Sequence, residues 1–137
     1  MLPNIFNSTN IPALAEVVNF AQARQGILAG NIANINTPGY RVRDLSLESF
    51  QQKLKEAITQ YRASGEEISP GIVSKDSSDP MRNVRESLTN ILYHDDTNLD
   101  LEKQTAEITK NQFLHSFALT VMNDQFQLLQ TAISERV

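Results

Sequence analysis

The sequence predicts an all-α fold built on two long helices near the two ends of the chain, each with the apolar seam of a coiled coil. Two apolar patterns with alternating four- and three-residue steps predict these helices, one over 11–35 and one over 98–135. Between them, the segment 41–97 is rich in turn-forming residues and is expected to be irregular, with a short helix or strand at most. With 137 residues the chain has the length of one domain. We therefore expect a single elongated unit over 1–137.

The first helix is expected to span Ile11 to Ile35 and to stop sharply. Pro38 disfavours the helical conformation at Thr37. Pro38 and Gly39 suit the two central positions of a type II turn, with Gly39 at positive φ. The apolar seam of this helix comprises Leu14, Val18, Ala21, Gln25, Leu28, Ile32 and Ile35.

Two glycines, Gly26 and Gly30, interrupt the first helix four residues apart. Each glycine costs helix stability relative to alanine, about 1 kcal/mol. One interpretation is that the bare backbone lets a neighbouring helix approach closely. The other is that the glycines are a tolerated weak point or hinge. We favour close packing.

The middle of the chain gives weaker signals. Leu47, Phe50, Leu54, Ile58 and Tyr61 recur at helical spacing and predict a helix from Arg41 to about Arg62. The Ser-, Asp-, Pro- and Gly-rich stretch 63–80 is expected to be a loop, with room for one short strand at 68–73. The segment 81–94 fits either a short helix or a strand at 88–93.

The last helix should begin at a cap formed by Thr97 or Asn98, with Asp100 favoured by the helix dipole in the first turn. Its seam comprises Leu101, Thr105, Ile108, Gln112, His115, Leu119, Met122, Phe126, Leu129 and Ile133. A second apolar stripe comprises Leu114, Phe117, Val121 and Leu128. A helix with two apolar faces has more surface to bury than one partner helix covers, so neighbouring subunits are expected.

Packing within the hairpin and between subunits is therefore the expected role of the apolar seams. Four polar residues interrupt the seams, namely Gln25, Thr105, Gln112 and His115. They either fix register and partner choice or reflect imperfect amphipathicity. The residues expected to serve packing and assembly are Leu14, Val18, Leu28, Ile32, Ile35, Leu101, Ile108, Leu119, Met122, Phe126, Leu129 and Ile133. Leu119→Asp is expected to abolish assembly, because it buries an unpaired charge.

No motif in the sequence points to catalysis. The chain lacks cysteine, and its two histidines, His94 and His115, have no partners at metal-ligand spacing. We find no phosphate-binding glycine loop and no nucleophile elbow. A net charge of −4 without a basic block argues against nucleic acid as a partner. We expect no enzyme activity, no cofactor, no metal site and no small-molecule substrate.

Targeting signals are equally sparse. No stretch reaches the ~20 apolar residues that a membrane-spanning helix needs. The first residues lack the basic and apolar regions of a cleaved signal peptide. Export, if it occurs, is expected to use another route.

The end of the first helix carries a family resemblance. Asn31-Ile32-Ala33-Asn34 followed by Thr37-Pro38-Gly39-Tyr40 resembles the N-I-A-N-x-x-T-P-G-Y signature of flagellar rod, hook and hook-associated proteins. The segment 93–103 resembles the entry to the terminal helix in the proximal-rod FlgB family. Asp96, Thr97 and Leu99 depart from that family's usual residues, so its rod paralogue, the FlgC family, remains the alternative.

The resemblance implies that the two end helices pair as an antiparallel coiled-coil hairpin. It also implies a structural subunit of the bacterial flagellar basal-body rod, the hollow drive shaft in the periplasm. It implies assembly with copies of itself, other rod proteins, the adaptor FliE and components of the membrane ring and export gate. It also implies export by the flagellar type III apparatus without a cleaved signal peptide. A soluble helical export chaperone or adaptor is the alternative from a different class.

Overall fold

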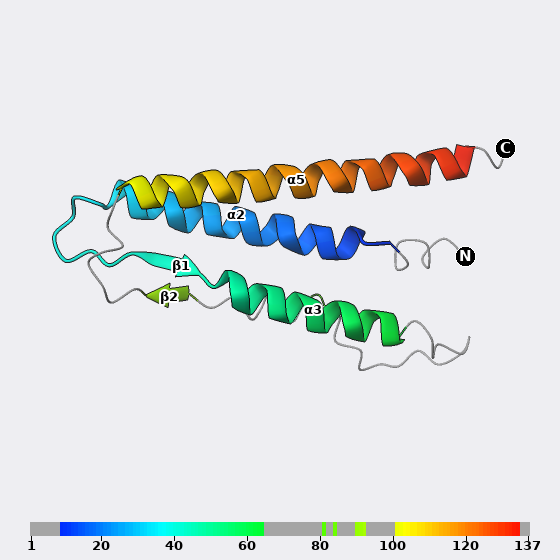
Figure 1. The fold of residues 1–137 in the computed structure, drawn as a ribbon, viewed down its shortest axis with the longest axis horizontal. Helices are drawn as coiled ribbons and strands as arrows, with labels where there is room; N and C mark the ends of the chain where they lie inside the picture. The colour runs from blue at the N-terminus through cyan, green and yellow to red at the C-terminus, as the bar shows by residue number, and fades with distance from the viewer. Residues whose placement is uncertain (1–8, 65–80, 82–83, 85–89, 93–100, 135–137) are drawn as a thin grey trace.

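Two long helices lie side by side and run in opposite directions along the whole molecule (Figure 1). The computed structural model describes residues 9–64, 81, 84, 90–92 and 101–134. Helix α2 spans Ile11–Ala33 and helix α5 spans Leu101–Ser134. Their antiparallel pairing confirms the predicted all-α hairpin, and the first helix ends two residues earlier than expected. The predicted caps Thr97, Asn98 and Asp100 lie outside the described residues.

A third helix lies against α2 and is separated from α5 by it in the view of Figure 1. Helix α3 spans Leu47–Ser64, six residues shorter at its start than the helix predicted from Arg41. The difference arises because strand β1, Arg43–Leu45, occupies the intervening residues. The Ser46 hydroxyl then accepts a hydrogen bond from the Ser49 N–H at 3.1 Å, which is the side-chain capping that starts a helix.

Strand β1 pairs antiparallel with β2, Asn90–Leu92, with Asp44 opposite Ile91. The segment 81–94 uses both conformations that its sequence allowed. Met81 and Val84 are helical, whereas residues 90–92 form the strand. The loop predicted at 63–80 begins two residues late, because α3 continues to Ser64. Its remainder, 65–80, with the possible strand, lies outside the described residues.

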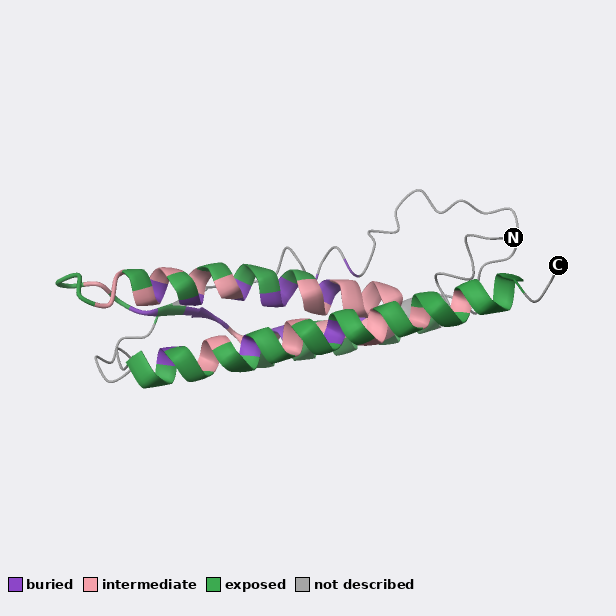
Figure 2. Cartoon of the chain, turned by 90° about the horizontal axis from the view of Figure 1, so that it is seen from above, coloured by how far each residue is buried: buried purple, intermediate pink, exposed green. Residues whose placement is uncertain are grey.

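The apolar core lies between α2 and α3. Phe20 of α2 and Phe50 of α3 stack with ring centroids 4.1 Å apart and planes at 11°. Around them, Leu45, Ala57, Met81 and Val84 are buried. Buried residues gather on the inner sides of α2 and on β1, whereas much of α5 is exposed (Figure 2). The main apolar core therefore fixes α3 to α2, and α5 is held by other means.

Candidate functional site: the interface between the terminal helices

The interface that joins α5 to α2 is largely polar. The fully buried residues of α5 are Gln104, Asn111 and Ala118, spaced seven residues apart. The Asn111 side-chain amide donates to the Ala21 carbonyl at 2.8 Å and to Gln25 Oε1 at 3.0 Å. Buried polar groups are costly unless paired, so these bonds work only in one register. The interface thus sets the alignment of the two helices by hydrogen bonding.

Asn31, the first asparagine of the signature segment, joins four parts of the chain. Its side chain is 1% exposed. Its Nδ2 donates to the Arg43 carbonyl at 2.7 Å and to Gln104 Oε1 at 3.2 Å. Its Oδ1 accepts from the Tyr40 hydroxyl and from the Arg43 N–H, each at 3.1 Å. A single amide therefore ties together the end of α2, the following turn, β1 and the first turns of α5.

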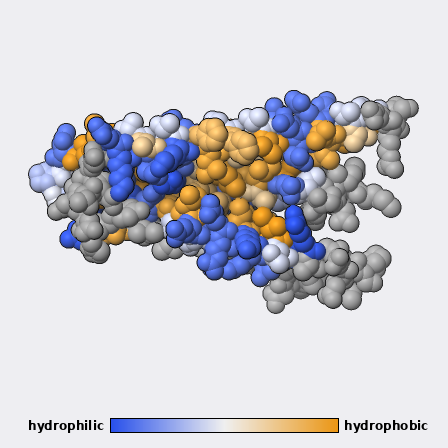
Figure 3. Space-filling view, in the orientation of Figure 1, coloured by the Kyte–Doolittle hydropathy of each residue, from blue (hydrophilic) through white to orange (hydrophobic). Residues whose placement is uncertain are grey.

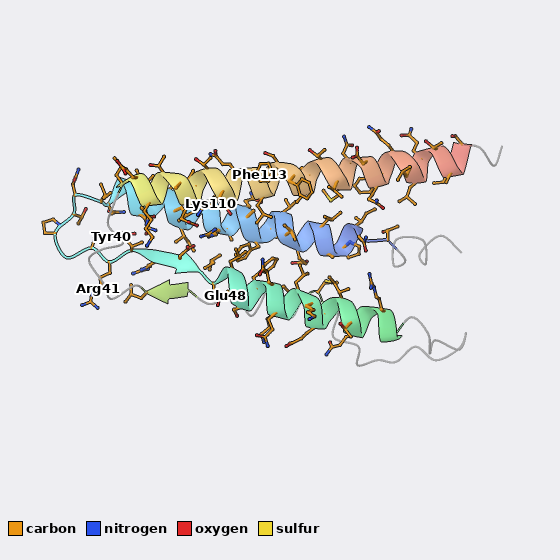
Figure 4. All side chains as sticks on the ribbon, in the orientation of Figure 1. Tyr40, Arg41, Glu48, Lys110 and Phe113 are labelled. Atoms are coloured by element: carbon orange, nitrogen blue, oxygen red, sulfur yellow. The ribbon has the colours of Figure 1, made fainter. Side chains whose placement is uncertain are left out.

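The rest of the signature shapes the exit from α2. Asn34 donates through its backbone N–H and its Nδ2 to the Gly30 carbonyl, at 3.1 and 2.8 Å. The Tyr40 N–H donates to the Thr37 carbonyl at 3.1 Å, which closes a four-residue turn. Gly39 has φ 74°, as predicted for the third position of a type II turn. Tyr40 and Arg41 mark this end of the molecule in Figure 4.

A buried ion cluster lies about two turns before Asn31 on α2. Arg24 Nε and Nη2 donate to the two carboxylate oxygens of Asp44 at 2.8 and 2.7 Å, a bidentate pair. Nη2 also donates to Glu107 of α5 at 2.8 Å. The side chains of Arg24 and Asp44 are 7% and 11% exposed. The cluster therefore links α2, β1 and α5 through a single guanidinium.

Electrostatics favour the charged forms in this cluster. The hydrogen bond to Asp44 is the main cause of a raised pKa of Arg24, and the bond to Glu107 adds to it. The hydrogen bond from Lys110 lowers the pKa of Glu107, and the bond from Arg24 reinforces the shift against partial burial. Asp44 also accepts from the Leu45 N–H at 2.7 Å. Each carboxylate is thus satisfied by more than one donor.

The predicted seam of α2 lies on the correct side, since Ala21 and Gln25 contact Asn111 of α5. Leu28 is 1% exposed, and Leu14, Val18, Ile32 and Ile35 are half-buried. Only some of the predicted seam positions of α5 are covered in the structure. Ile108, Met122 and Leu129 are half-buried, as is His115.

The other predicted α5 residues do not bury within the hairpin. Leu101, Leu119, Phe126 and Ile133 are 53%, 39%, 44% and 59% exposed. The hairpin itself does not cover these four residues, and their packing against neighbouring subunits stays a prediction. They are left uncovered because the inner positions belong to Gln104, Asn111 and Ala118, one residue before the positions chosen from apolarity.

The outer side of α5 carries large apolar side chains without a partner in the described part of the chain. Phe113 is 73% exposed, Phe117 57% and Leu128 64%. The rings of Phe113 and Phe117 stack on each other with centroids 6.2 Å apart. In the space-filling view, apolar side chains form a continuous area over the middle of the paired helices, and hydrophilic ones cover α3 (Figure 3).

Sequence reasoning missed the residues of the polar interface, namely Arg24, Asp44, Gln104, Glu107 and Asn111. One signal was available. Arg24 and Glu16 are the only charged residues in the 23-residue α2, and both are buried. Charged residues are rarely buried unless they are paired, so a charged residue in a helix that is otherwise almost uncharged suggests a partner on another element. Nothing local to Asp44 or Glu107 identified that partner.

The described residues hold no group of three or more histidine, aspartate or glutamate side chains that could bind a metal ion. Among the helices of the described ranges, none is long and apolar enough to cross a membrane.

Comparisons of the sequence with known proteins give matches among flagellar rod proteins. The family model described as flagella basal body rod protein matches residues 18–41, which include the signature segment and most of α2. FlgB of Yersinia enterocolitica is 28% identical over 88% of this chain and 90% of its own length. FlgB of Salmonella typhimurium is 29% identical over 82% of this chain and 83% of its own length. FlgB of Bacillus subtilis is 24% identical over 96% and 97%.

The chain forms an antiparallel hairpin whose helices are aligned by polar contacts and whose outer side is apolar. Together with these matches, this arrangement defines a structural subunit of the bacterial flagellar basal-body rod. Within that class the chain is similar, over most of its length, to FlgB proteins of the proximal rod, in agreement with the resemblance of its segment 93–103. These relatives are FlgB proteins and do not support the alternative assignment to the FlgC family.

Proposed function

We propose that the chain builds the rod by packing the outer faces of its two terminal helices against neighbouring subunits. One observation carries this proposal. The α5 helix exposes Phe113, Phe117, Leu128 and Ile133 by more than half of their surface, and Asp124 is the only charged residue between 111 and 134. Soluble monomers rarely expose large contiguous apolar patches unless those patches bind a partner. An exposed, nearly uncharged helix is suited to a packed wall of helices.

The exposed seam residues of α5 fit this role. Leu101, Leu119, Phe126 and Ile133 are available for contacts between subunits, because α2 does not cover them. In contrast, α3 carries five charged side chains, and all of them are exposed. Charged surfaces keep contact with water, whereas uncharged apolar ones are buried on assembly. In the assembled rod, α3 would therefore remain at a solvated surface and α2 and α5 would be enclosed.

The role is structural and does not include catalysis. The Arg24 cluster and the Asn31 amide are occupied by hydrogen bonds within the chain. A catalytic group needs access to a substrate and a perturbed pKa near the working pH. The shifts found here stabilise the charged forms of Arg24 and Glu107 and hold them in ion pairs.

The family resemblance supports the remaining parts of the proposal. The subunit would lie in the periplasmic section of the basal body and contact copies of itself and other rod proteins. The adaptor FliE and components of the membrane ring and export gate would be further neighbours. Export would proceed through the flagellar type III apparatus without removal of a signal peptide.

The test is mass spectrometry of purified hook–basal bodies from the source cells. We expect several copies of this chain per particle, with its first residues intact. A chain absent from the particles but abundant in the cytoplasm contradicts the proposal and favours an export chaperone or adaptor.

A matched pair of variants tests the packing mechanism in the same particles. Leu119→Asp places a charge on the exposed apolar side of α5, where the fold tolerates it because Leu119 is 39% exposed. We expect this variant to be exported and stable but missing from rods. Gln51→Asp introduces the same charge on exposed α3 and should assemble normally. Equal incorporation of both variants contradicts the packing mechanism.

A further inference from the structure

The outward side of α2 is a continuous face of small, uncharged residues. Asn19, Ala23, Gly26, Gly30 and Ala33 follow one another in steps of four and three, so they share one side of the helix. All are exposed except Gly30, which is half-buried. A Cβ atom added at Gly26 or Gly30 would meet nothing within 4 Å. Within the described part of the chain, no contact therefore requires glycine at these two positions, although glycines weaken the helix.

The outward side of α5 carries the opposite kind of surface. The Asn111 side chain points at α2, and each residue advances about 100° around a helix. Phe113, two residues on, therefore lies about 200° around the helix from Asn111, on the far side from α2. Phe117 lies one turn further along and stacks on Phe113. Figure 4 labels Phe113 near the middle of α5.

Both faces are uncharged, and they complement each other in side-chain size. Neither carries an exposed charge: the charged residues of α2, Glu16 and Arg24, are buried, and no charged residue lies between Lys110 and Asp124 on α5. Large side chains interdigitate best with small residues that let a helix backbone come close. A face of small residues alone would accept many helices, but here the same chain also presents the aromatic pair.

We infer that Phe113 and Phe117 of one copy pack against the Ala23, Gly26 and Gly30 face of α2 in the next copy. This inference deepens the proposed function by naming the partner as a second copy of the chain and the two faces that meet. The faces lie on different helices, so the contact is heterologous and adds copies in one direction. Such contacts generate rings or open helical assemblies. The geometry suits a subunit stacked along a tube.

Paired cysteines test the contact directly, because the chain has no cysteine of its own. Rods isolated from cells that produce Gly26→Cys/Phe117→Cys are oxidised and run on a non-reducing gel. The expected result is a ladder of covalent dimers, trimers and longer species, since each copy offers both halves of the contact. Each single variant should give monomers. The matched control replaces Gly26→Cys with Lys53→Cys, on exposed α3, and should give no ladder.

Other gel patterns contradict the inference. Dimers from Phe117→Cys alone indicate that the aromatic faces of two copies pair with each other. Bands in which Phe117→Cys is joined to a different rod protein place another partner on this face. Either result leaves the proposed function intact, because the chain is then present in the rods that were isolated. Absence of the chain from those rods is the separate failure of the proposed function itself.

A larger side chain on the small-residue face of α2 gives an independent test. Gly26→Leu should raise the melting temperature of the isolated chain, because leucine favours a helix more than glycine and the added Cβ atom meets nothing within 4 Å. The same change should lower incorporation into rods at least tenfold, because the side chain occupies the place of an aromatic ring. Gln51→Leu adds equal apolar bulk on α3 and should leave incorporation unchanged. Normal incorporation of Gly26→Leu overturns the inference.

Discussion

Removing the Arg24 guanidinium should destabilise the fold more than any surface change. In Arg24→Met the buried Asp44 carboxylate loses its bidentate partner, and Glu107 loses one of its two donors. Breaking a buried ion pair from one side typically costs about 3–5 kcal/mol, because the remaining charge stays buried. The Asp44 side chain is only 11% exposed, so water cannot fully replace the lost donors.

The assay is thermal unfolding of the purified chain, followed by far-ultraviolet circular dichroism at neutral pH. For a chain of this length each kcal/mol shifts the melting temperature by roughly 3–6 °C, so a decrease of about 10–25 °C is expected. Arg62→Met, at an exposed position on α3, is the control and should change stability by less than about 0.5 kcal/mol.

A second substitution separates the buried charge from the loss of packing. In Arg24→Met/Asp44→Leu the unpaired carboxylate is gone, and replacement of a buried ion pair by apolar residues is often nearly neutral. The double variant should therefore melt above Arg24→Met. If Arg24→Met melts within about 2 °C of the unmodified chain, the cluster does not hold the helices together and the reasoning is refuted.

Three further predictions follow from the same interface. Asn31→Ala removes four hydrogen bonds from a buried site and should cost about 2–4 kcal/mol in urea unfolding; a smaller loss than 1 kcal/mol contradicts the central role of this amide. Gly39→Ala meets no atom within 4 Å but forces φ 74° on alanine, so a loss of about 1 kcal/mol is expected from strain alone; no loss means the turn relaxes. Glu107 has a folded pKa below its ordinary range because of Lys110 and Arg24, so its contribution is present above about pH 4.3 and disappears as the pH falls through the folded value. Glu107→Gln should accordingly be less sensitive to acid over that range, and an unchanged acid profile argues against this ion pair.

Local signals in the sequence were sufficient for the helices and for the turn. The existence of α2 and α5 follows from long uninterrupted helical patterns, and Pro38 with Gly39 fixes where the chain leaves α2. These features depend on residues that are close together in the sequence and on their backbone preferences, so they can be predicted without knowledge of distant contacts. The start of α3 was misplaced, because β1 forms only when a distant segment, Asn90–Leu92, pairs with it.

The face of α5 that meets α2 could not be predicted from apolarity. The interface uses Gln104, Asn111 and Ala118, whereas the rule that apolar residues face inward selects Leu119 and Phe126. A one-residue shift along a helix turns the face by about 100°. The rule fails because it assumes that the chain buries its best apolar surface within itself.

The isolated chain buries polar side chains between α2 and α5 and leaves large apolar ones exposed, and this arrangement limits its stability. Polar contacts such as those of Asn111 fix register but each adds only about 1 kcal/mol, since they replace bonds to water. Exposed side chains such as Phe113 and Leu128 add no hydrophobic stabilisation until a neighbour covers them. Full burial of such a side chain contributes about 1.5–3 kcal/mol. The terminal helices should therefore be aligned, but weakly stabilised, in the free subunit, and should gain most of their stability from the neighbours that cover their apolar faces. A subunit of this kind can be unfolded at low cost before assembly and becomes stable only where the next subunit is already in place.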